Sequence, residues 1–93
     1  MATPGRKVGV EWYRADQWDT LREVSSDRAR LEERFSDWKA RAEAKLKELK
    51  SLGLDPRAVP IDVGELVAWC RERARPVDES SRGAYMAEKL RSS

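Results

Sequence analysis

The chain has 93 residues, of which 40% are hydrophobic and 39% are charged, and its formal net charge is +2. A chain of this length forms one domain with a thin core, because it buries only about 60–65% of its unfolded surface. The near balance of 19 basic and 17 acidic residues excludes the strong basic excess that dedicated nucleic-acid binders carry.

The lack of histidine and the single cysteine exclude the common catalytic and metal-binding arrangements. No Ser–His–Asp or Cys–His pair can form, no histidine-based zinc motif is present, and the scattered glycines match no phosphate-binding loop. Adjacent acids such as Glu32–Glu33 and Asp78–Glu79 lie in charged stretches typical of solvated surface. The sequence therefore predicts a protein that is not an enzyme, with no catalytic residue, no cofactor and no metal site.

Cysteine usage and hydropathy also bear on location. Cys70 has no second cysteine to pair with, which is typical of a reducing compartment. The N-terminus has no apolar signal segment, and the longest apolar run, Leu66 to Cys70, is far shorter than the ~20 residues of a membrane span. These features predict a cytoplasmic protein without membrane association, and the Arg- and Ala-rich usage suggests a bacterial source.

In chain order, residues 1–7 contain Pro4 and Gly5 and no hydrophobic pattern, which predicts a flexible tail ahead of a single helical domain at 8–91. Val8, Val10 and Trp12 then alternate with polar or small residues, as in a short strand. A second short strand at 58–61, around a proline, is its expected partner. The prediction here is one minor two-stranded β element, residues 8–12 with 58–61.

Two amphipathic segments follow the first strand. Trp18, Leu21 and Val24 have helical spacing and predict a helix at 15–24. Residues 27–52 form either one helix or a short helix at 28–34 followed by a longer one at 37–52 with Ser36 as its cap, ending at Gly53. The apolar stripe of this segment comprises Leu31, Phe35, Trp38, Ala42, Leu46 and Leu49.

Two further helices complete the predicted fold. Asp62, with Glu65 three residues on, resembles a capping box and predicts a helix start, with Pro76 beyond its end. A last helix at 80–90 is expected to be capped by Ser80 or Ser81. The predicted fold class is mostly α, a small array of four to five helices with the minor β element.

The positions of the four tryptophans and the cysteine relative to the predicted apolar faces indicate which of them are core residues. Trp18 and Trp38 fall on apolar faces and are predicted to be core residues, and Cys70 shares such a face and is predicted to be a buried, inert thiol. Trp69 lies next to the main apolar face of its helix and Trp12 lies near the predicted flexible tail. Both are candidate partner contacts, because tryptophan is enriched at interface hot spots, and core packing is the alternative for both. The leading hypothesis is a non-enzymatic protein-interaction module that binds a protein partner or forms a homodimer.

The alternative hypothesis is a weak, salt-sensitive nucleic-acid binder. Residues 28–50 carry eight basic and five acidic residues, and Arg34, Arg41 and Lys45 are its candidate phosphate contacts. Acidic residues are interleaved with these cations, and the aromatic residues of the segment lie on the apolar stripe. A solvated helix face is therefore the preferred interpretation, and nucleic acid is not the expected partner.

One set of residues resembles a known group of sequences. It comprises the run Val59-Pro60-Ile61-Asp62-Val63-Gly64-Glu65-Leu66, then Trp69-Cys70, Ser81-Arg82 and Tyr85, together with Trp12-Tyr13-Arg14 and Trp38. This set, spread over residues 12–90, resembles small, uncharacterised bacterial proteins of unknown function. The resemblance implies no activity, ligand or catalytic residue.

Overall fold

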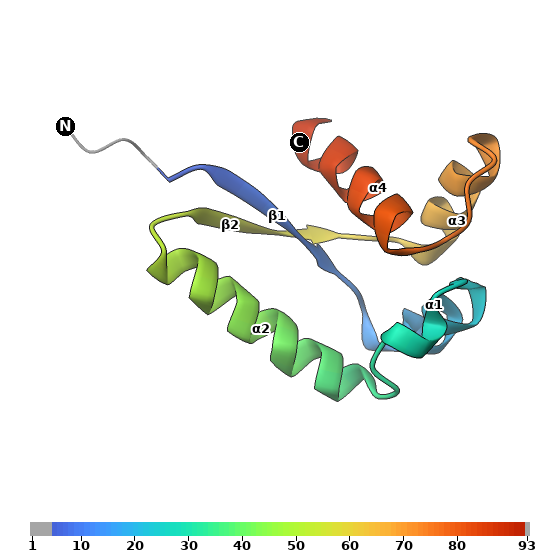
Figure 1. The fold of residues 1–93 in the computed structure, drawn as a ribbon, viewed down its shortest axis with the longest axis horizontal. Coiled ribbons are helices and arrows are strands. Elements are labelled where there is room, and N and C mark those ends of the chain that lie inside the picture. Colours follow the sequence, from blue (N-terminus) through green and yellow to red (C-terminus); the bar gives the residue numbers. More distant parts are fainter. Residues whose placement is uncertain (1–4, 93) are drawn as a thin grey trace.

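The computed structural model describes residues 5–92. Its elements in chain order are β1 (Lys7–Trp12), the 3-10 turn η1 (Ala15–Gln17), α1 (Trp18–Val24), the 3-10 turn η2 (Arg28–Arg30), α2 (Phe35–Ser51), β2 (Asp55–Pro60), α3 (Val63–Glu72) and α4 (Glu79–Ser92). Figure 1 shows the two strands as a twisted pair, which cross in this view, with the helices around them. The predicted mostly α fold with a minor β element is confirmed for these residues, whereas residues 1–4 of the predicted tail lie outside them.

The two strands pair in parallel, so the chain between them must cross from one end of the sheet to the other. The N–H of Asp55 donates to the carbonyl of Arg6 at 2.9 Å, and the N–H of Ile61 donates to the carbonyl of Trp12 at 2.9 Å. Main-chain groups alternate in direction along a strand, so even-numbered residues of β1 and odd-numbered residues of β2 face each other. The remaining main-chain groups of each strand point to the outer edges of the sheet.

Strand β2 begins at Asp55, three residues before the predicted start at residue 58. Proline lacks the N–H that a strand donates to its neighbour in a sheet. Pro56 and Pro60 are even-numbered, however, and their nitrogen atoms point to the outer edge of β2, where no donor is required. Both prolines therefore fit within the strand.

The sheet lies between two helices. The indole of Trp12 contacts that of Trp38 from α2 at a centroid distance of 5.5 Å, so this side of β1 faces α2. A Cβ atom added to Gly9 would collide with the sulfur of Met86 on α4, so the opposite side of β1 faces α4. Figure 1 shows the same order, with α2 below the strands and α4 above them. Glycine at position 9 lets α4 approach the strand closely.

The segment 27–52 is broken rather than continuous. Residues 28–30 form one 3-10 turn, and α2 begins at Phe35 with Arg34 at its N-cap position. The predicted cap Ser36 is wrong, because Ser36 lies inside the first turn of α2 and Arg34 caps the helix without a side-chain hydrogen bond. The start of α2 is set by packing: Phe35 and Trp38 both lie against the core cluster.

The caps of α3 and α4 come from aspartates. Asp62 Oδ1 accepts a hydrogen bond from the N–H of Glu65 at 3.0 Å, as the capping box predicted. The predicted caps Ser80 and Ser81 of α4 are wrong, because both residues lie inside that helix. Asp78, directly before the helix, is the cap instead, because its Oδ1 accepts a hydrogen bond from the N–H of Ser81 at 2.9 Å.

The core lies where α1, α3 and α4 meet the ends of the strands. Its buried members are Tyr13, Trp18, Leu21, Val59, Ile61, Val63, Leu66, Cys70, Val77 and Tyr85. Trp18 is 2% exposed and Cys70 is 1% exposed, which confirms their predicted burial. Trp38 is partly buried and packs against this cluster from α2.

Helix α3 ends in a left-handed residue. The N–H of Arg75 donates to the carbonyl of Cys70 at 2.9 Å, and the N–H of Ala74 donates to the carbonyl of Arg71 at 3.1 Å. These two bonds are the hydrogen-bond pattern of a Schellman motif. Ala74 holds the position that glycine usually takes, with φ of 52°. A side chain at this backbone conformation destabilises the native state.

We therefore expect Ala74→Gly to raise the free energy of unfolding by about 0.5–1 kcal/mol, measured by urea denaturation. Ala68→Gly is the matched control, because Ala68 is an exposed residue in the interior of the same helix. It should lower stability by about 0.5–1 kcal/mol. If Ala74→Gly were as destabilising as Ala68→Gly, the left-handed assignment would be wrong.

Candidate functional site

A cavity of about 460 Å³ lies between β1, α2 and the start of α4. Its lining combines aromatic rings with side chains of both charges. The aromatic members are Tyr13, Trp18 and Trp38, the acidic members are Glu11, Asp27, Glu32 and Glu79, and the basic members are Arg30, Arg41, Lys45 and Arg82. This mixture suits a partner surface with polar and apolar groups more than it suits a uniformly charged ligand.

The aromatic wall of the cavity is a connected cluster centred on Trp38. Its ring lies 5.4 Å from that of Tyr13 and 5.3 Å from that of Trp18, measured between centroids. The indole N–H of Trp18 donates to the carbonyl of Glu32 at 2.9 Å, which fixes the turn between η2 and α2. The wall is therefore held in place by packing and by a buried donor that has its acceptor.

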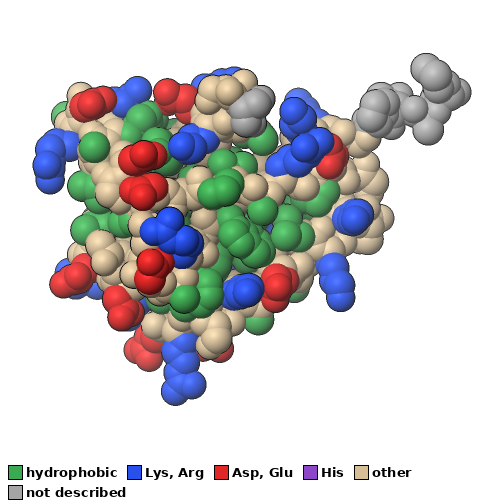
Figure 2. All heavy atoms as spheres, turned by 180° about the vertical axis from the view of Figure 1, so that it is seen from behind, with side chains coloured by type: hydrophobic (Ala, Val, Ile, Leu, Met, Phe, Trp, Pro, Cys, Tyr) green, Lys and Arg blue, Asp and Glu red, His purple; other side chains and the backbone are tan. Residues whose placement is uncertain are grey.

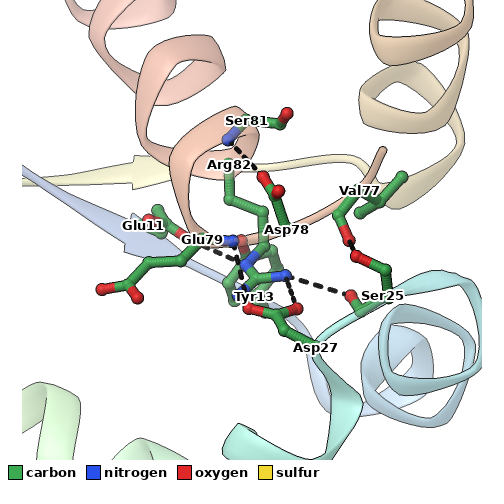
Figure 3. Close-up of polar contacts among 10 residues, drawn as sticks. Glu11, Tyr13, Ser25, Asp27, Val77, Asp78, Glu79, Ser81 and Arg82 are labelled. Carbon is green, nitrogen blue, oxygen red and sulfur yellow. Dashed lines mark hydrogen bonds and ion pairs between the residues drawn. The ribbon is translucent and has the colours of Figure 1, made fainter. Parts of the chain in front are cut away.

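The polar end of the cavity is organised by Arg82, which is 5% exposed. Its two terminal nitrogens donate to the two carboxylate oxygens of Asp27 at 2.9 and 2.8 Å, and one of them also donates to the hydroxyl of Ser25 at 3.1 Å. Figure 3 shows the guanidinium reaching from α4 toward Asp27, with Glu11 and Tyr13 on its other side. A bidentate pair of this kind fixes orientation as well as contributing energy.

Asp27 also holds the start of α4. The N–H of Glu79 donates to Asp27 Oδ2 at 3.1 Å, across a separation of 52 residues. One carboxylate therefore joins the segment after α1 to both the backbone and a side chain of α4. Hydrogen bonding from Arg82 is the main reason that the pKa of Asp27 lies below its ordinary value.

The pKa of Glu11 shifts in the opposite direction to that of Asp27. Burial raises the pKa of its carboxyl, although a hydrogen bond from Tyr13 and the charge of Arg82 both act to lower it. The hydroxyl of Tyr13 donates to Glu11 Oε1 at 2.6 Å. Burial and the neighbouring negative charge of Glu11 raise the pKa of Tyr13, so its hydroxyl stays protonated and remains a donor.

Beside this cavity lies an open edge of the sheet. The N–H and C=O groups of Lys7, Gly9 and Glu11 point away from β2, by the alternation described above. Within residues 5–92, no hydrogen bond engages these main-chain groups. The outer edge of β2 is different, because two of its three outward positions are prolines. The sheet therefore has one edge that can accept another strand and one that resists it.

The rear of the molecule, on the far side from the view of Figure 1, carries an apolar patch. Figure 2 shows hydrophobic side chains gathered in its middle with charged side chains around them. A second cavity, of about 570 Å³, is lined by α2 and β2 and includes Leu46, Leu54, Pro56 and Ala58. Glu43, Lys47, Lys50 and Asp55 add charged groups to the same lining.

The two candidate contact tryptophans lie in different environments. Trp12 is half-buried at the end of β1 and packs on Trp38. Trp69 donates its indole N–H to Glu88 Oε2 at 2.9 Å, and the guanidinium of Arg73 lies 4.2 Å from the centroid of its ring. Trp69 is therefore already covered by groups of its own chain, whereas Trp12 lies beside the open edge.

The three candidate nucleic-acid contacts do not form one basic patch. Arg41 and Lys45 line the cavity, and the guanidinium of Arg41 is paired with the carboxylate of Glu32. Arg34 lies at the N-cap of α2 and is not part of the cavity lining. The sequence analysis missed Glu11, Tyr13, Asp27 and Arg82 as site residues. No local pattern could show them, because Arg82 and Asp27 are 55 residues apart.

No family model, no curated protein and no solved structure matches this chain. The candidate site is therefore interpreted from its own geometry. Among residues 5–92, no helix is long and apolar enough to cross a membrane. In the same part of the chain, no group of three or more His, Cys, Asp or Glu side chains could hold a metal ion.

Replacing Asp27 by asparagine should be strongly destabilising. The change removes the charge that binds both terminal nitrogens of the buried Arg82 guanidinium and leaves it the more distant carboxylate of Glu11, at 3.9 Å. We expect the free energy of unfolding to fall by about 3 kcal/mol in denaturant titrations. The double variant Asp27→Asn with Arg82→Met removes the guanidinium charge as well and should recover part of this loss. Equal stability of Asp27→Asn and the parent protein would contradict the role of the pair.

The Arg82–Asp27 pair should also determine how the stability of the protein falls at acidic pH. Because the pKa of Asp27 is lowered on folding, its contribution is present above the ordinary aspartate pKa of about 3.9 and is lost as the pH falls through the lowered value. Glu11 acts in the opposite sense, because its raised pKa removes stability as the pH rises. In thermal melts, the melting temperature of Asp27→Asn should therefore fall less than that of the parent between pH 5 and pH 2. This interval lies within the range of about pH 1–5 where such carboxylates titrate.

Proposed function

We propose that this chain is a non-enzymatic protein-interaction module that binds its partner by adding a β-strand to the open edge of β1. The observation that carries the proposal is the contrast between the two edges of the sheet. Main-chain donors and acceptors of Lys7, Gly9 and Glu11 are unpaired, while the opposite edge carries Pro56 and Pro60. Strand addition takes its affinity from such main-chain groups and its specificity from pockets for alternate side chains.

The surroundings of the edge provide those pockets. Side chains of an added strand alternate between the α2 side and the α4 side of the sheet. On the α2 side they meet Val10 and Trp38, which line the cavity. On the α4 side they meet Glu11, with Arg82 behind it at 3.9 Å. The edge therefore combines an apolar contact on one face with a charged contact on the other.

Phosphate binding is less well supported by the same site. Arg41 and Lys45 share the cavity with four acidic side chains, and Arg41 is already paired with Glu32. A nucleic-acid surface needs cations that are free to replace the counterions of phosphates. The alternative of a weak nucleic-acid binder therefore ranks below strand addition.

The edge can be blocked by one substitution. Lys7→Pro removes an outward N–H and leaves the β1–β2 hydrogen bonds intact, because those bonds use the even-numbered residues of β1. Ala58→Pro is the matched control, since it makes the same change at the outer edge of β2. We expect proteins captured from nuclease-treated lysate by the parent and by Ala58→Pro to be lost with Lys7→Pro.

Circular dichroism and thermal melting should show that both proline variants fold. Capture that is unchanged by Lys7→Pro, or capture that disappears on nuclease treatment, would overturn the proposal. The first result would remove the edge as the binding site, and the second would make nucleic acid the partner.

A further inference from the structure

We infer that the strand accepted by this edge is β1 of a second copy, paired antiparallel about Gly9 to form a homodimer with one continuous four-stranded sheet. The inference rests on the interaction function proposed above and names its partner. The strand order across the dimer is β2–β1–β1–β2. The argument depends on which residues of β1 face outward and on the charges that they carry.

Geometry restricts the pairing to a few registers. In an antiparallel pair, residues whose N–H and C=O groups point at the partner face each other as hydrogen-bonded pairs, with Cα atoms about 5.5 Å apart. In β1 these residues are Lys7, Gly9 and Glu11. When Gly9 faces Gly9 of the second copy, Lys7 of each chain faces Glu11 of the other.

Charge selects this register from its neighbours. A shift of two residues places Lys7 opposite Gly9 or Tyr13, where no carboxylate meets it. A shift of four residues places Lys7 opposite Lys7 or Glu11 opposite Glu11, and like charges that face each other across strands are destabilising. The register centred on Gly9 is thus the one that makes two opposite-charge pairs, related by the two-fold axis.

Glu11 has reason to receive such a partner. Its carboxylate is partly buried, with a side-chain exposure of 26%, and it lies 3.9 Å from the Nε atom of Arg82. Both terminal nitrogens of Arg82 are already bonded to Asp27. A lysine ammonium from the second copy would add a second counter-charge to Glu11, whose carboxylate in this chain has Arg82 Nε at 3.9 Å and the hydroxyl of Tyr13 at 2.6 Å.

The other face of the strand is complementary as well. In the same register Val8 faces Val10 as a non-hydrogen-bonded pair, for which the Cα atoms are about 4.5 Å apart and the side chains are closest. Arg6 faces Trp12, so a cation can lie against an indole at each end of the pair. Val8, Val10 and Trp12 are each partly exposed in the single chain and would be covered by the partner.

Dimerisation would also remove the exposed edge. In the single chain the two-stranded sheet is stabilised by packing against α2 and α4, and the dimer would extend it to four strands. In the dimer the open edges of both chains are joined, and the edges that remain are those of β2 with their prolines. The dimer is closed by its symmetry and has no open edge with which to add further copies.

The first test measures self-association by sedimentation equilibrium. We expect the parent to be a dimer and Lys7→Glu to weaken dimerisation by about tenfold, since each of two pairs becomes a like-charge contact. Lys39→Glu reverses a charge at an exposed position of α2 and is the matched control, with no expected effect. A monomeric parent, or equal dissociation constants for the two variants, would overturn the inference.

The second test reads the register by disulfide formation. A mixture of Val8→Cys and Val10→Cys chains should form a cross-linked dimer on mild oxidation, because the paired Cα distance suits a disulfide. Each variant alone should stay uncross-linked, since identical positions then lie on a diagonal about 7–8 Å apart. Cys70 is buried and does not compete.

Cross-linking of either variant alone, to the same extent as the mixture, would overturn this register. The outcomes also separate the two proposals. A monomeric parent whose captured partners are lost with Lys7→Pro would overturn the homodimer and leave strand addition standing. A dimer that forms equally well with Lys7→Pro would overturn both.

Discussion

The parallel pairing of β1 with β2 determines how the rest of the chain is arranged. Parallel strands cannot be joined by a tight turn, so the 42 residues between Trp12 and Asp55 must return along the sheet, and α2 makes that return. Helix α2 then covers one face of the sheet. The chain after β2 has the other face free, and α4 packs there against Gly9. The same pairing decides which main-chain groups point outward.

The interaction of Arg82 with Asp27 secures this arrangement at one end. The crossover leaves the turn after α1 beside the start of α4, where the N–H of Glu79 donates to Asp27 Oδ2. A buried guanidinium that binds both carboxylate oxygens of Asp27 and the hydroxyl of Ser25 makes the junction specific in geometry. Removing two charges from water costs free energy, so a buried pair adds little net stability compared with apolar side chains of similar volume, although breaking it is costly. The polar end of the cavity therefore has a defined shape.

Much of the fold follows from local sequence patterns, and most of the site does not. Helical spacing and the Asp62 cap predict three of the four helices closely, and alternation at Val8–Trp12 predicts β1. Local patterns failed where distant residues decide the outcome. The prolines of β2 are tolerated because of the strand's partner. The main partner of Asp27 lies 55 residues away in the sequence.

The asymmetry between the two edges is the feature that most directly connects sequence to function. In β2 the outward positions are Pro56, Ala58 and Pro60, so a strand that approached from that side would meet two missing donors. In β1 the outward positions are Lys7, Gly9 and Glu11, which keep every donor and place opposite charges four residues apart. Lys7 and Glu11 are equally far from Gly9, so in an antiparallel pair centred on Gly9 each of them faces the opposite charge of the second copy. A selected edge of this kind is better explained by a partner strand than by solvent, since lone open edges expose a chain to unspecific pairing.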